Sequence, residues 1–381
     1  MRITSVACAT TGAALLVLLA FVSAIRTSAD SSQPASFKQA DKAGLKTCGP
    51  PVTHSVFVAD GWGAYWSHAL NTIAFNRQSS DGYFHIFLIN PDGSNERVFG
   101  ASTPGFPAKT VGTPAYSPNG KYLAFAAEKA VHPEGTAAAS PGWGGYSDLW
   151  VARSDGSKVW QMTNTPSDPD HGTMLPEFSP DGTLLEWTER TKTGNPFDLN
   201  RPGGDWAIKV ADFVDQADGP ALQNIRSYSP GGDHFNETGG FSPDSKSLVF
   251  TSDFANSNFW KNQIFRLDLA TGKTTQLTDG DEYNEHPRYT PDGRVIWMSG
   301  KNQCLIGCGS DWWIMNADGS NQVRLTYFDD KTSPGYYGRE VWATEVQTAN
   351  WSPDGSYFYG DVLTNLITNR GQIVKVSLTC S

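Results

Sequence analysis

A pattern of one aromatic, one hydroxyl and several apolar positions recurs six times along the chain. In FSPDGTLLEW, which begins at Phe178, the aromatic residue and a serine precede Pro-Asp-Gly, and an apolar run follows. The aromatic position is occupied in turn by Trp66, Tyr116, Phe178, Phe241, Tyr289 and Trp351. The hydroxyl residues that follow are Ser67, Ser117, Ser179, Ser242, Thr290 and Ser352, so successive copies start 50, 62, 63, 48 and 62 residues apart. The chain is therefore built from six repeats.

Each copy of this pattern predicts a tight turn between two strands. The serine hydroxyl can bond the local backbone, proline presets φ, and glycine accepts the left-handed conformation that reverses the chain. The first copy, WSHALNTIAF, lacks Pro-Asp-Gly, so we expect a different turn there. A second hairpin follows in most copies, as in SDLWVARSDGSKVWQMT, and a looser version follows the third in DWAIKVADFVDQADGPALQNI. Six units of four antiparallel strands predict an all-β, six-bladed propeller.

The sixth repeat ends after three strands, which leaves one blade incomplete. The segment HSVFVAD, residues 54–60, precedes the first repeat and has the composition of a strand. We expect it to close the ring as the fourth strand of the last blade. That arrangement brings Cys48 next to Cys380, and the expected disulfide would span 380 − 48 = 332 positions.

The other cysteines also suit an exported protein. Cys8 lies in the leader, so four cysteines remain after its removal, and an even number favours disulfides outside the cytosol. We expect a second bridge between Cys304 and Cys308 in QCLIGCG. A four-cysteine zinc site is the alternative, but the spacings lack a pair of C-x₂-C knuckles.

The N-terminus reads as a secretory signal peptide over residues 1–29. Arg2 precedes an apolar run too short for a membrane span, and small residues offer cleavage after Ala24 or Ala29. An uncleaved anchor is the alternative. Residues 30–49 are expected to form a flexible linker, and residues 50–381 the propeller. The expected location is the periplasm or the extracellular space, with no membrane span in the mature chain.

Charge and motifs exclude several functions. The formal net charge is −10, which disfavours nucleic acid and anionic membrane surfaces as partners. The sequence has no G-x-S-x-G elbow, no H-E-x-x-H and no phosphate-binding G-x-x-x-x-G-K-[ST]. We expect a monomer.

The SPDG turn, the aromatic residue before it and the Asp-Gly hairpin resemble the repeat of the TolB-like six-bladed β-propellers, over about residues 54 to 380. The resemblance implies this fold and says little about function. The family's namesake carries an α/β domain that contacts other envelope proteins, whereas here only the expected linker precedes the propeller. The chain thus looks TolB-like rather than like TolB itself.

Meander topology places the long connections on one face of the disc, where function normally lies. His171, His234 and His286 occur in connections that lead into innermost strands, with acidic residues nearby. Imidazoles and carboxylates are ligands for a transition metal, so these histidines are candidate ligands of one divalent ion. The alternative is that they only satisfy backbone groups, in which case no cofactor is present.

Aromatic, acidic and basic residues in the same connections are candidate ligand-binding residues. Exposed rings in glycine-rich loops can stack on sugars or contact a protein partner. The candidates are Trp62, Trp143, Asp170, Asp233, Glu285, Tyr336, Tyr337, Arg339, Trp342 and Glu345.

The sequence therefore favours an exported propeller that binds an envelope or extracellular protein, or a glycan, through its long-loop face, and it favours binding over catalysis. The alternative is a metal-assisted polysaccharide-degrading enzyme, similar in architecture to the propeller oligogalacturonate lyases. That resemblance implies metal ligation by the three histidines, with Arg339 or a carboxylate assisting proton abstraction. A structural module in a surface assembly is the third interpretation.

Overall fold

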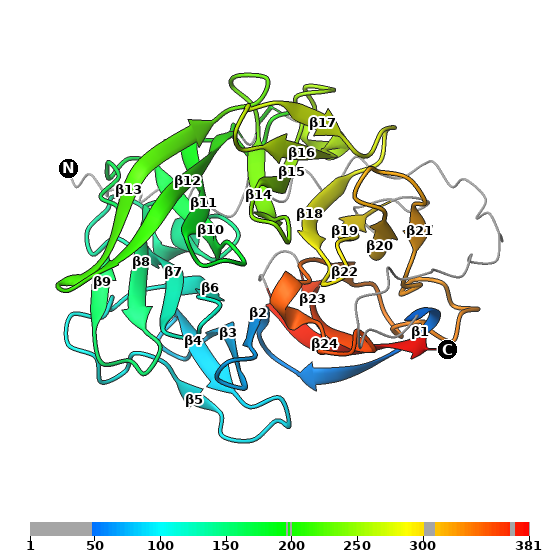
Figure 1. The fold of residues 1–381 in the computed structure, drawn as a ribbon, viewed down its shortest axis with the longest axis horizontal. Coiled ribbons are helices and arrows are strands. Elements are labelled where there is room, and N and C mark those ends of the chain that lie inside the picture. The colour runs from blue at the N-terminus through cyan, green and yellow to red at the C-terminus, as the bar shows by residue number, and fades with distance from the viewer. Residues whose placement is uncertain (1–47, 196, 199, 301–308, 366–369, 381) are drawn as a thin grey trace, which may run out of the picture.

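The computed structural model describes residues 48–195, 197–198, 200–300, 309–365 and 370–380. Six four-stranded antiparallel sheets surround one axis, which confirms the predicted propeller (Figure 1). The innermost strands of blades 1 to 6 are β2 (Trp62–Ser67), β6 (Val111–Tyr116), β10 (Gly172–Phe178), β14 (Asn236–Phe241), β18 (Asn284–Tyr289) and β22 (Trp342–Ala343). The expected signal peptide and the Cys304–Cys308 bridge lie outside the described residues.

The remaining strands continue outward in each blade. Blades 1 and 2 add β3 (Thr72–Gln78), β4 (Phe84–Ile89), β5 (Arg97–Val98), β7 (Tyr122–Glu128), β8 (Ser147–Arg153) and β9 (Val159–Gln161). Blades 3 and 4 add β11 (Leu184–Lys192), β12 (Asp205–Gln216), β13 (Gly219–Tyr228), β15 (Ser247–Ser252), β16 (Gln263–Asp268) and β17 (Thr274–Gln276). Blades 5 and 6 add β19 (Val295–Ser299), β20 (Asp311–Met315), β21 (Val323–Arg324), β23 (Tyr357–Asn365), β24 (Arg370–Cys380) and β1 (Cys48–Val58).

Short 3₁₀ helices occur in the connections between strands. In the described ranges they are η1 (Thr136–Ala139), η2 (Phe259–Lys261) and η3 (Thr348–Asn350). No helix in this part of the chain has the length and apolar content needed to cross a bilayer.

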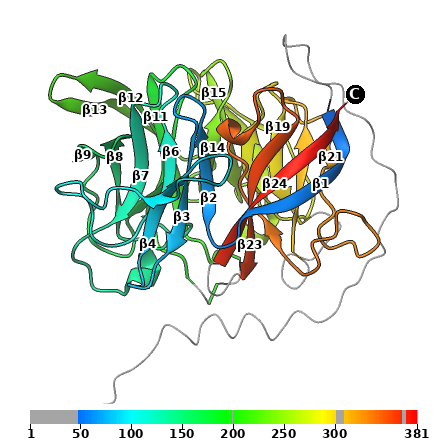
Figure 2. The same ribbon diagram turned by 90° about the horizontal axis from the view of Figure 1, so that it is seen from below.

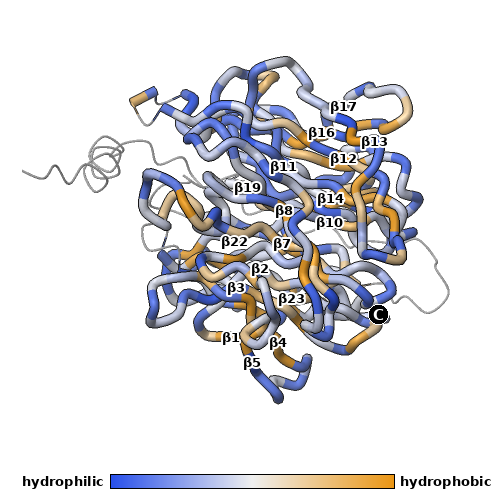
Figure 3. Tube along the Cα trace, turned by 90° about the vertical axis from the view of Figure 1, so that its left-hand side faces the viewer, coloured by the Kyte–Doolittle hydropathy of each residue, from blue (hydrophilic) through white to orange (hydrophobic). Residues whose placement is uncertain are grey.

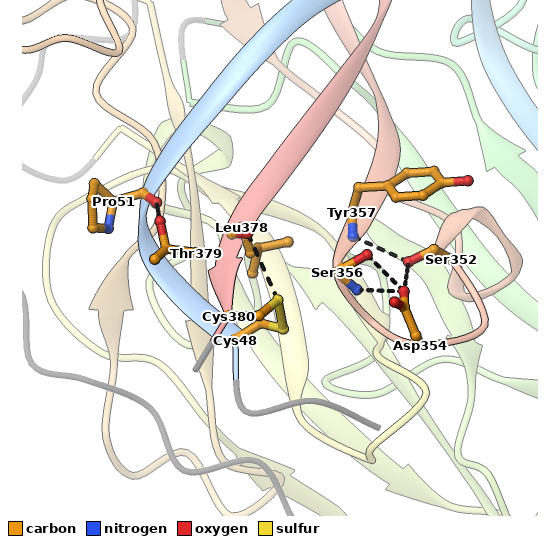
Figure 4. The surroundings of a disulfide bond; sticks show 9 residues. All are labelled: Cys48, Pro51, Ser352, Asp354, Ser356, Tyr357, Leu378, Thr379 and Cys380. Atoms are coloured by element: carbon orange, nitrogen blue, oxygen red, sulfur yellow. Dashed lines mark hydrogen bonds between the residues drawn. A yellow bond between two sulfur atoms is a disulfide. The ribbon is translucent and has the colours of Figure 1, made fainter. Parts of the chain in front are cut away.

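The repeated turn has the hydrogen bonds that its sequence predicts. In blade 6 the Ser352 hydroxyl donates to Asp354 Oδ1 at 2.9 Å and accepts from the Tyr357 N–H at 3.1 Å (Figure 4). Gly355 has φ +71°, the left-handed conformation that reverses the chain. In the first copy, which lacks Pro-Asp-Gly, Asn71 takes the left-handed position with φ +49°. Asparagine tolerates that conformation better than most residues.

The hydrophobic core lies between neighbouring blades. Phe241 of blade 4, for example, packs in one cluster with Ile208 and Val210 of β12 in blade 3. The aromatic residue before each turn is buried, and we call these residues the anchor aromatics: Trp66, Tyr116, Phe178, Phe241, Tyr289 and Trp351. Figure 3 shows apolar and hydrophilic stretches alternating along the stacked strands. Each blade therefore gains most of its stability from its neighbours rather than alone.

The first described strand closes the ring. β1 pairs antiparallel with β24, from Cys48 opposite Cys380 to Val58 opposite Ile373, and the two strands run side by side (Figure 2). The predicted disulfide joins Cys48 and Cys380 across a sequence separation of 332 residues (Figure 4). β1 begins at Cys48, so residues 48 and 49 belong to the strand rather than to the expected linker.

Loss of this disulfide is expected to destabilise the propeller without changing its fold. A covalent link over 332 residues restricts the unfolded chain strongly, and its removal should lower the free energy of unfolding by about 3–5 kcal/mol. Denaturant unfolding of Cys48→Ser, Cys380→Ser and the double variant should give one common value, because each change breaks the same bond. Stability equal to that of the wild type would contradict this role.

Candidate functional site

The inner strands start at the loop-rich face, so their first residues surround the axis at that end. Four positions before the anchor aromatic, blades 1 to 5 have Trp62, Gly112, Met174, Glu237 and Glu285. Carboxylates thus occupy this position in blades 4 and 5, whereas blades 1 to 3 have apolar or small residues. The equivalent positions of the blades form a ring around the axis. We call the side of blades 4 and 5 the charged half of this ring and the side of blades 1 to 3 the apolar half.

A β-bulge in the inner strands brings additional side chains to the axis. The register of β18 with β19 shifts between Glu285 and Arg288, and His286 within the bulge has φ +53°. Thr113 and Leu175, at the equivalent positions of blades 2 and 3, have φ +52° and +53°. The left-handed residue is therefore part of the blade architecture and not specific to His286. Its effect here is that the consecutive Glu285 and His286 side chains meet, although neighbours in a regular strand point to opposite faces.

The loop-side layer of the site is an imidazole surrounded by carboxylates. His286 Nδ1 lies 3.3 Å from Glu237 Oε2 and 3.6 Å from Glu345 Oε1, and Nε2 lies 3.3 Å from Glu285 Oε2. Burial opposes the imidazolium form, but the charges of Glu285 and Glu237 outweigh it and raise the pKa of His286 to about 10. Burial also raises the pKa of Glu285 to about 7. The His286 side chain remains 18% exposed, so the layer is open to solvent at one side.

A deeper layer is centred on the buried Arg288. Its Nε donates to Gln347 Oε1 at 2.7 Å and lies 3.5 Å from Glu177 Oε2, and its Nη2 lies 3.4 Å from Glu345 Oε1. Gln347 Nε2 in turn donates to Glu345 Oε2 at 2.7 Å. Glu345 therefore connects the two layers. The surrounding carboxylates raise the pKa of Arg288 above its ordinary value despite burial.

Two further carboxyl groups lie opposite each other in blade 3. Glu177 of β10 pairs with Glu186 of β11, and both are buried. Among the described residues neither oxygen of Glu186 has a partner with full hydrogen-bond geometry, although the Thr238 hydroxyl and the Gly240 N–H lie near enough to act on its pKa. Burial and the charge of Glu177 raise the pKa of Glu186 to about 8, and burial raises that of Glu177 to about 7.

The apolar half of the loop-side end is covered by the connection between β7 and β8. Pro141 packs on Gly112, where a Cβ would overlap its ring, and a Cβ on Gly142 would lie 3.6 Å from the Trp62 ring. The next residue, Trp143, is 54% exposed. Its carbonyl accepts from the buried Arg190 of blade 3. The connection therefore extends from blade 1 to blade 3 and presents an indole ring to solvent.

The three predicted histidines do not converge. His171 Nδ1 lies 2.6 Å from Asp168 Oδ1, and His234 Nδ1 lies 2.9 Å from Asp253 Oδ1. Among the described residues, the metal-type side chains that come together are instead Glu237, Glu285 and His286. The reason is the offset from the turn: His171 and His234 precede β10 and β14, whereas His286 lies within β18.

The other predicted ligand-binding residues are spread over the loop-rich face. Tyr337 packs onto blade 6, stacked on His54 with ring centroids 4.9 Å apart, and its hydroxyl donates to Gln372 Oε1 at 2.7 Å. Arg339 is exposed and also donates to Gln372 Oε1, at 3.3 Å. Tyr336 and Trp342 are half-buried.

Two predicted acidic residues hold local loop structure. Asp170 Oδ1 accepts from the Thr193 N–H at 2.7 Å. Asp233 is exposed, and its carbonyl accepts from Arg201. Of the predicted residues, only Glu285, His286 and Glu345 belong to the axial layers.

Of the other axial residues, Glu237 was expected only as one of the acidic residues near the loop histidines, and Arg288, Glu177 and Glu186 were not predicted. A signal for three of them was available, because Glu237 shares the register position of Glu285, and Glu177 that of Arg288. Glu186 had no such signal, since it lies on a second strand and meets the axis only through pairing with Glu177.

The buried pair in blade 3 predicts a pH-dependent stability. Because the folded state raises the pKa of Glu186, it binds more protons than the unfolded state between about pH 4.5 and 8, and stability falls as the pH rises through this range. Glu186→Gln removes a buried carboxylate that has no well-formed hydrogen bond among the described residues. The variant should therefore be more stable than the wild type by roughly 1–3 kcal/mol at pH 8.5, with the difference vanishing near pH 4.5. Denaturant unfolding at several pH values measures it, and a pH-independent difference would contradict the assignment.

No protein-family model matches the chain. An uncharacterised protein of Agrobacterium fabrum is 26% identical over 213 residues, which is 56% of this chain and 57% of that protein. The chain thus matches little more than half the length of this relative.

Solved structures with a similar fold include TolB proteins. A TolB candidate from Agrobacterium tumefaciens has a TM-score of 0.50 at 14% identity, over 87% of this chain and 98% of that one. TolB from Acinetobacter baumannii has a TM-score of 0.48 at 17% identity, over 80% of this chain and 63% of that one. Likeness at such identities concerns the fold alone. In fold, the chain is a TolB-like six-bladed β-propeller.

Proposed function

We propose that the protein is an exported binding propeller that recognises an envelope or extracellular protein through its loop-rich face. The observation that carries this proposal is the exposed Trp143, whose backbone is held in place by Arg190. A large exposed ring on a backbone that is held in place has the properties of a binding hot spot, since the loop loses little backbone entropy on binding.

Other features of the same face support a protein partner. Val131 and Phe197, in the equivalent connections of blades 2 and 3, are 82% and 81% exposed. Exposed apolar side chains that share a face with Trp143 can add buried area to a protein interface. The axial carboxylates lie at the same end of the disc, and the chain has a net charge of −10. We therefore expect a partner that combines apolar side chains with basic ones.

The proposed location rests on covalent structure. The Cys48–Cys380 disulfide requires an oxidising compartment, which supports export to the periplasm or beyond. We further propose that the propeller acts as a monomer. The polysaccharide lyase alternative required three converging histidines, and the structure does not bring them together.

Site-specific photo-crosslinking tests which face binds. A crosslinking amino acid in place of Val131 or Phe197 should capture a partner from an envelope extract. The same replacement of Leu70, which is exposed in the β2–β3 turn on the opposite face, should not. Equal capture from both faces would refute the proposed surface.

Affinity measurements then test the hot spot. Trp143→Ala should weaken binding of the captured and purified partner at least tenfold, because the ring contributes buried area at the interface. Its melting temperature should stay unchanged, since the ring is largely in solvent, and Leu70→Ala serves as the matched control. If Trp143→Ala instead abolishes binding to a glycan array while protein capture is absent, the partner is a glycan.

A further inference from the structure

The loop-side axial layer has the geometry of a metal site. Glu237, Glu285 and His286 each offer a ligand atom, and these atoms all lie within 4.8 Å of one another. Around one nitrogen, His286 Nδ1 lies 3.3 Å from Glu237 Oε2 and 3.6 Å from Glu345 Oε1. Two ligands of a tetrahedral ion with bonds of about 2.0–2.2 Å are about 3.3–3.6 Å apart, so the spacing suits ligands of one ion.

The hydrogen bonding of these side chains leaves two buried atoms available to a ligand. Glu237 Oε2 and His286 Nδ1 are both buried atoms without a hydrogen-bond partner among the described residues, and they face each other. The Glu237 side chain is only 5% exposed. Buried polar atoms nearly always have hydrogen-bond partners, so two facing atoms that have only a 3.3 Å ion-pair contact mark a position where a cation could bind both side chains.

We propose that Glu237, Glu285 and His286 bind one divalent transition-metal ion of the Zn²⁺ or Mn²⁺ type at the loop-side end of the axis. One imidazole nitrogen with two carboxylate oxygens is a donor set for these ions, whereas Ca²⁺ prefers oxygen ligands throughout. Glu345 adds a third carboxylate 3.6 Å from His286 Nδ1. The partial exposure of His286 leaves a side open for exchangeable ligands.

The surrounding structure prepares these ligands. The bulge in β18 holds Glu285 and His286 together from one strand, and Glu237 comes from the adjacent strand β14 at the same register position. Each ring nitrogen of His286 faces a carboxylate oxygen. When Nδ1 binds the ion, Nε2 can donate its proton to one oxygen of Glu285, whose second oxygen can bind the ion; a carboxylate acceptor of this kind is the usual support of a metal-binding histidine.

Metal binding by purified, untagged protein tests the site without any partner. Zn²⁺ and Mn²⁺ are measured by isothermal titration calorimetry, and Co²⁺ by its visible absorption when bound. The wild type should bind about one equivalent and melt at a higher temperature with the metal. Glu237→Gln and His286→Asn should bind at least tenfold more weakly. Asparagine is chosen because it tolerates the positive φ at position 286.

His171→Asn is the matched control, since it changes a second histidine–carboxylate pair outside the site. It should bind metal as the wild type does, and melting curves without metal identify any variant that fails to fold. No uptake by the wild type would overturn the proposal, as would undiminished uptake by folded Glu237→Gln. Equal loss in His171→Asn would place the ion elsewhere. None of these outcomes depends on Trp143, so the metal site and the docking face are tested separately.

Discussion

Closure of the ring is the constraint on which the rest of the structure depends. The Cys48–Cys380 bond and the β1–β24 ladder complete blade 6, and only a complete blade 6 can pack against blade 1. Buried hydrogen bonds cross that junction: the Ala64 N–H donates to Asp361 Oδ2 at 3.2 Å, the Trp66 N–H donates to Asn350 Oδ1 at 2.9 Å, and Asn350 Nδ2 donates to the Ala64 carbonyl at 2.9 Å. The groups at the axis come from blades 3 to 6, so closure also sets their mutual distances.

The bulge in the inner strands brings additional polar side chains to the axis of this rigid ring. Every blade needs a twisted first strand, and a residue with positive φ recurs in the bulge at Gly63, Thr113, Leu175 and His286. The conformation is therefore supported by the architecture in general. In blade 5 this conformation directs His286 toward two glutamates. The strained backbone that recurs in several blades therefore also positions the side chains of the site.

The axial groups are poor choices for stability alone. Buried carboxylates such as Glu177, Glu186 and Glu285 have raised pKa values because the interior disfavours their charged forms. Apolar residues at these positions would pack at lower cost, as Met174 does at the position equivalent to Glu237. The charged half therefore indicates a function of the loop-side end. On the apolar half, Trp143 adds an exposed apolar ring to the same face.

Sequence alone determined the architecture, because its determinants are local and repeated. The anchor aromatics, the SPDG turns and the missing sixth-blade strand specify six blades, their closure and the Cys48–Cys380 pair. The site was predicted only in part from the sequence, which indicated Glu285, His286 and Glu345. His171 and His234 were grouped with them only because they occur in equivalent connections. Which side chains meet at the axis depends on strand register, bulges and the packing of blades that are distant in sequence. Glu237, Arg288 and Glu186 reach the axial layers through those long-range contacts, and only the tertiary structure decides them.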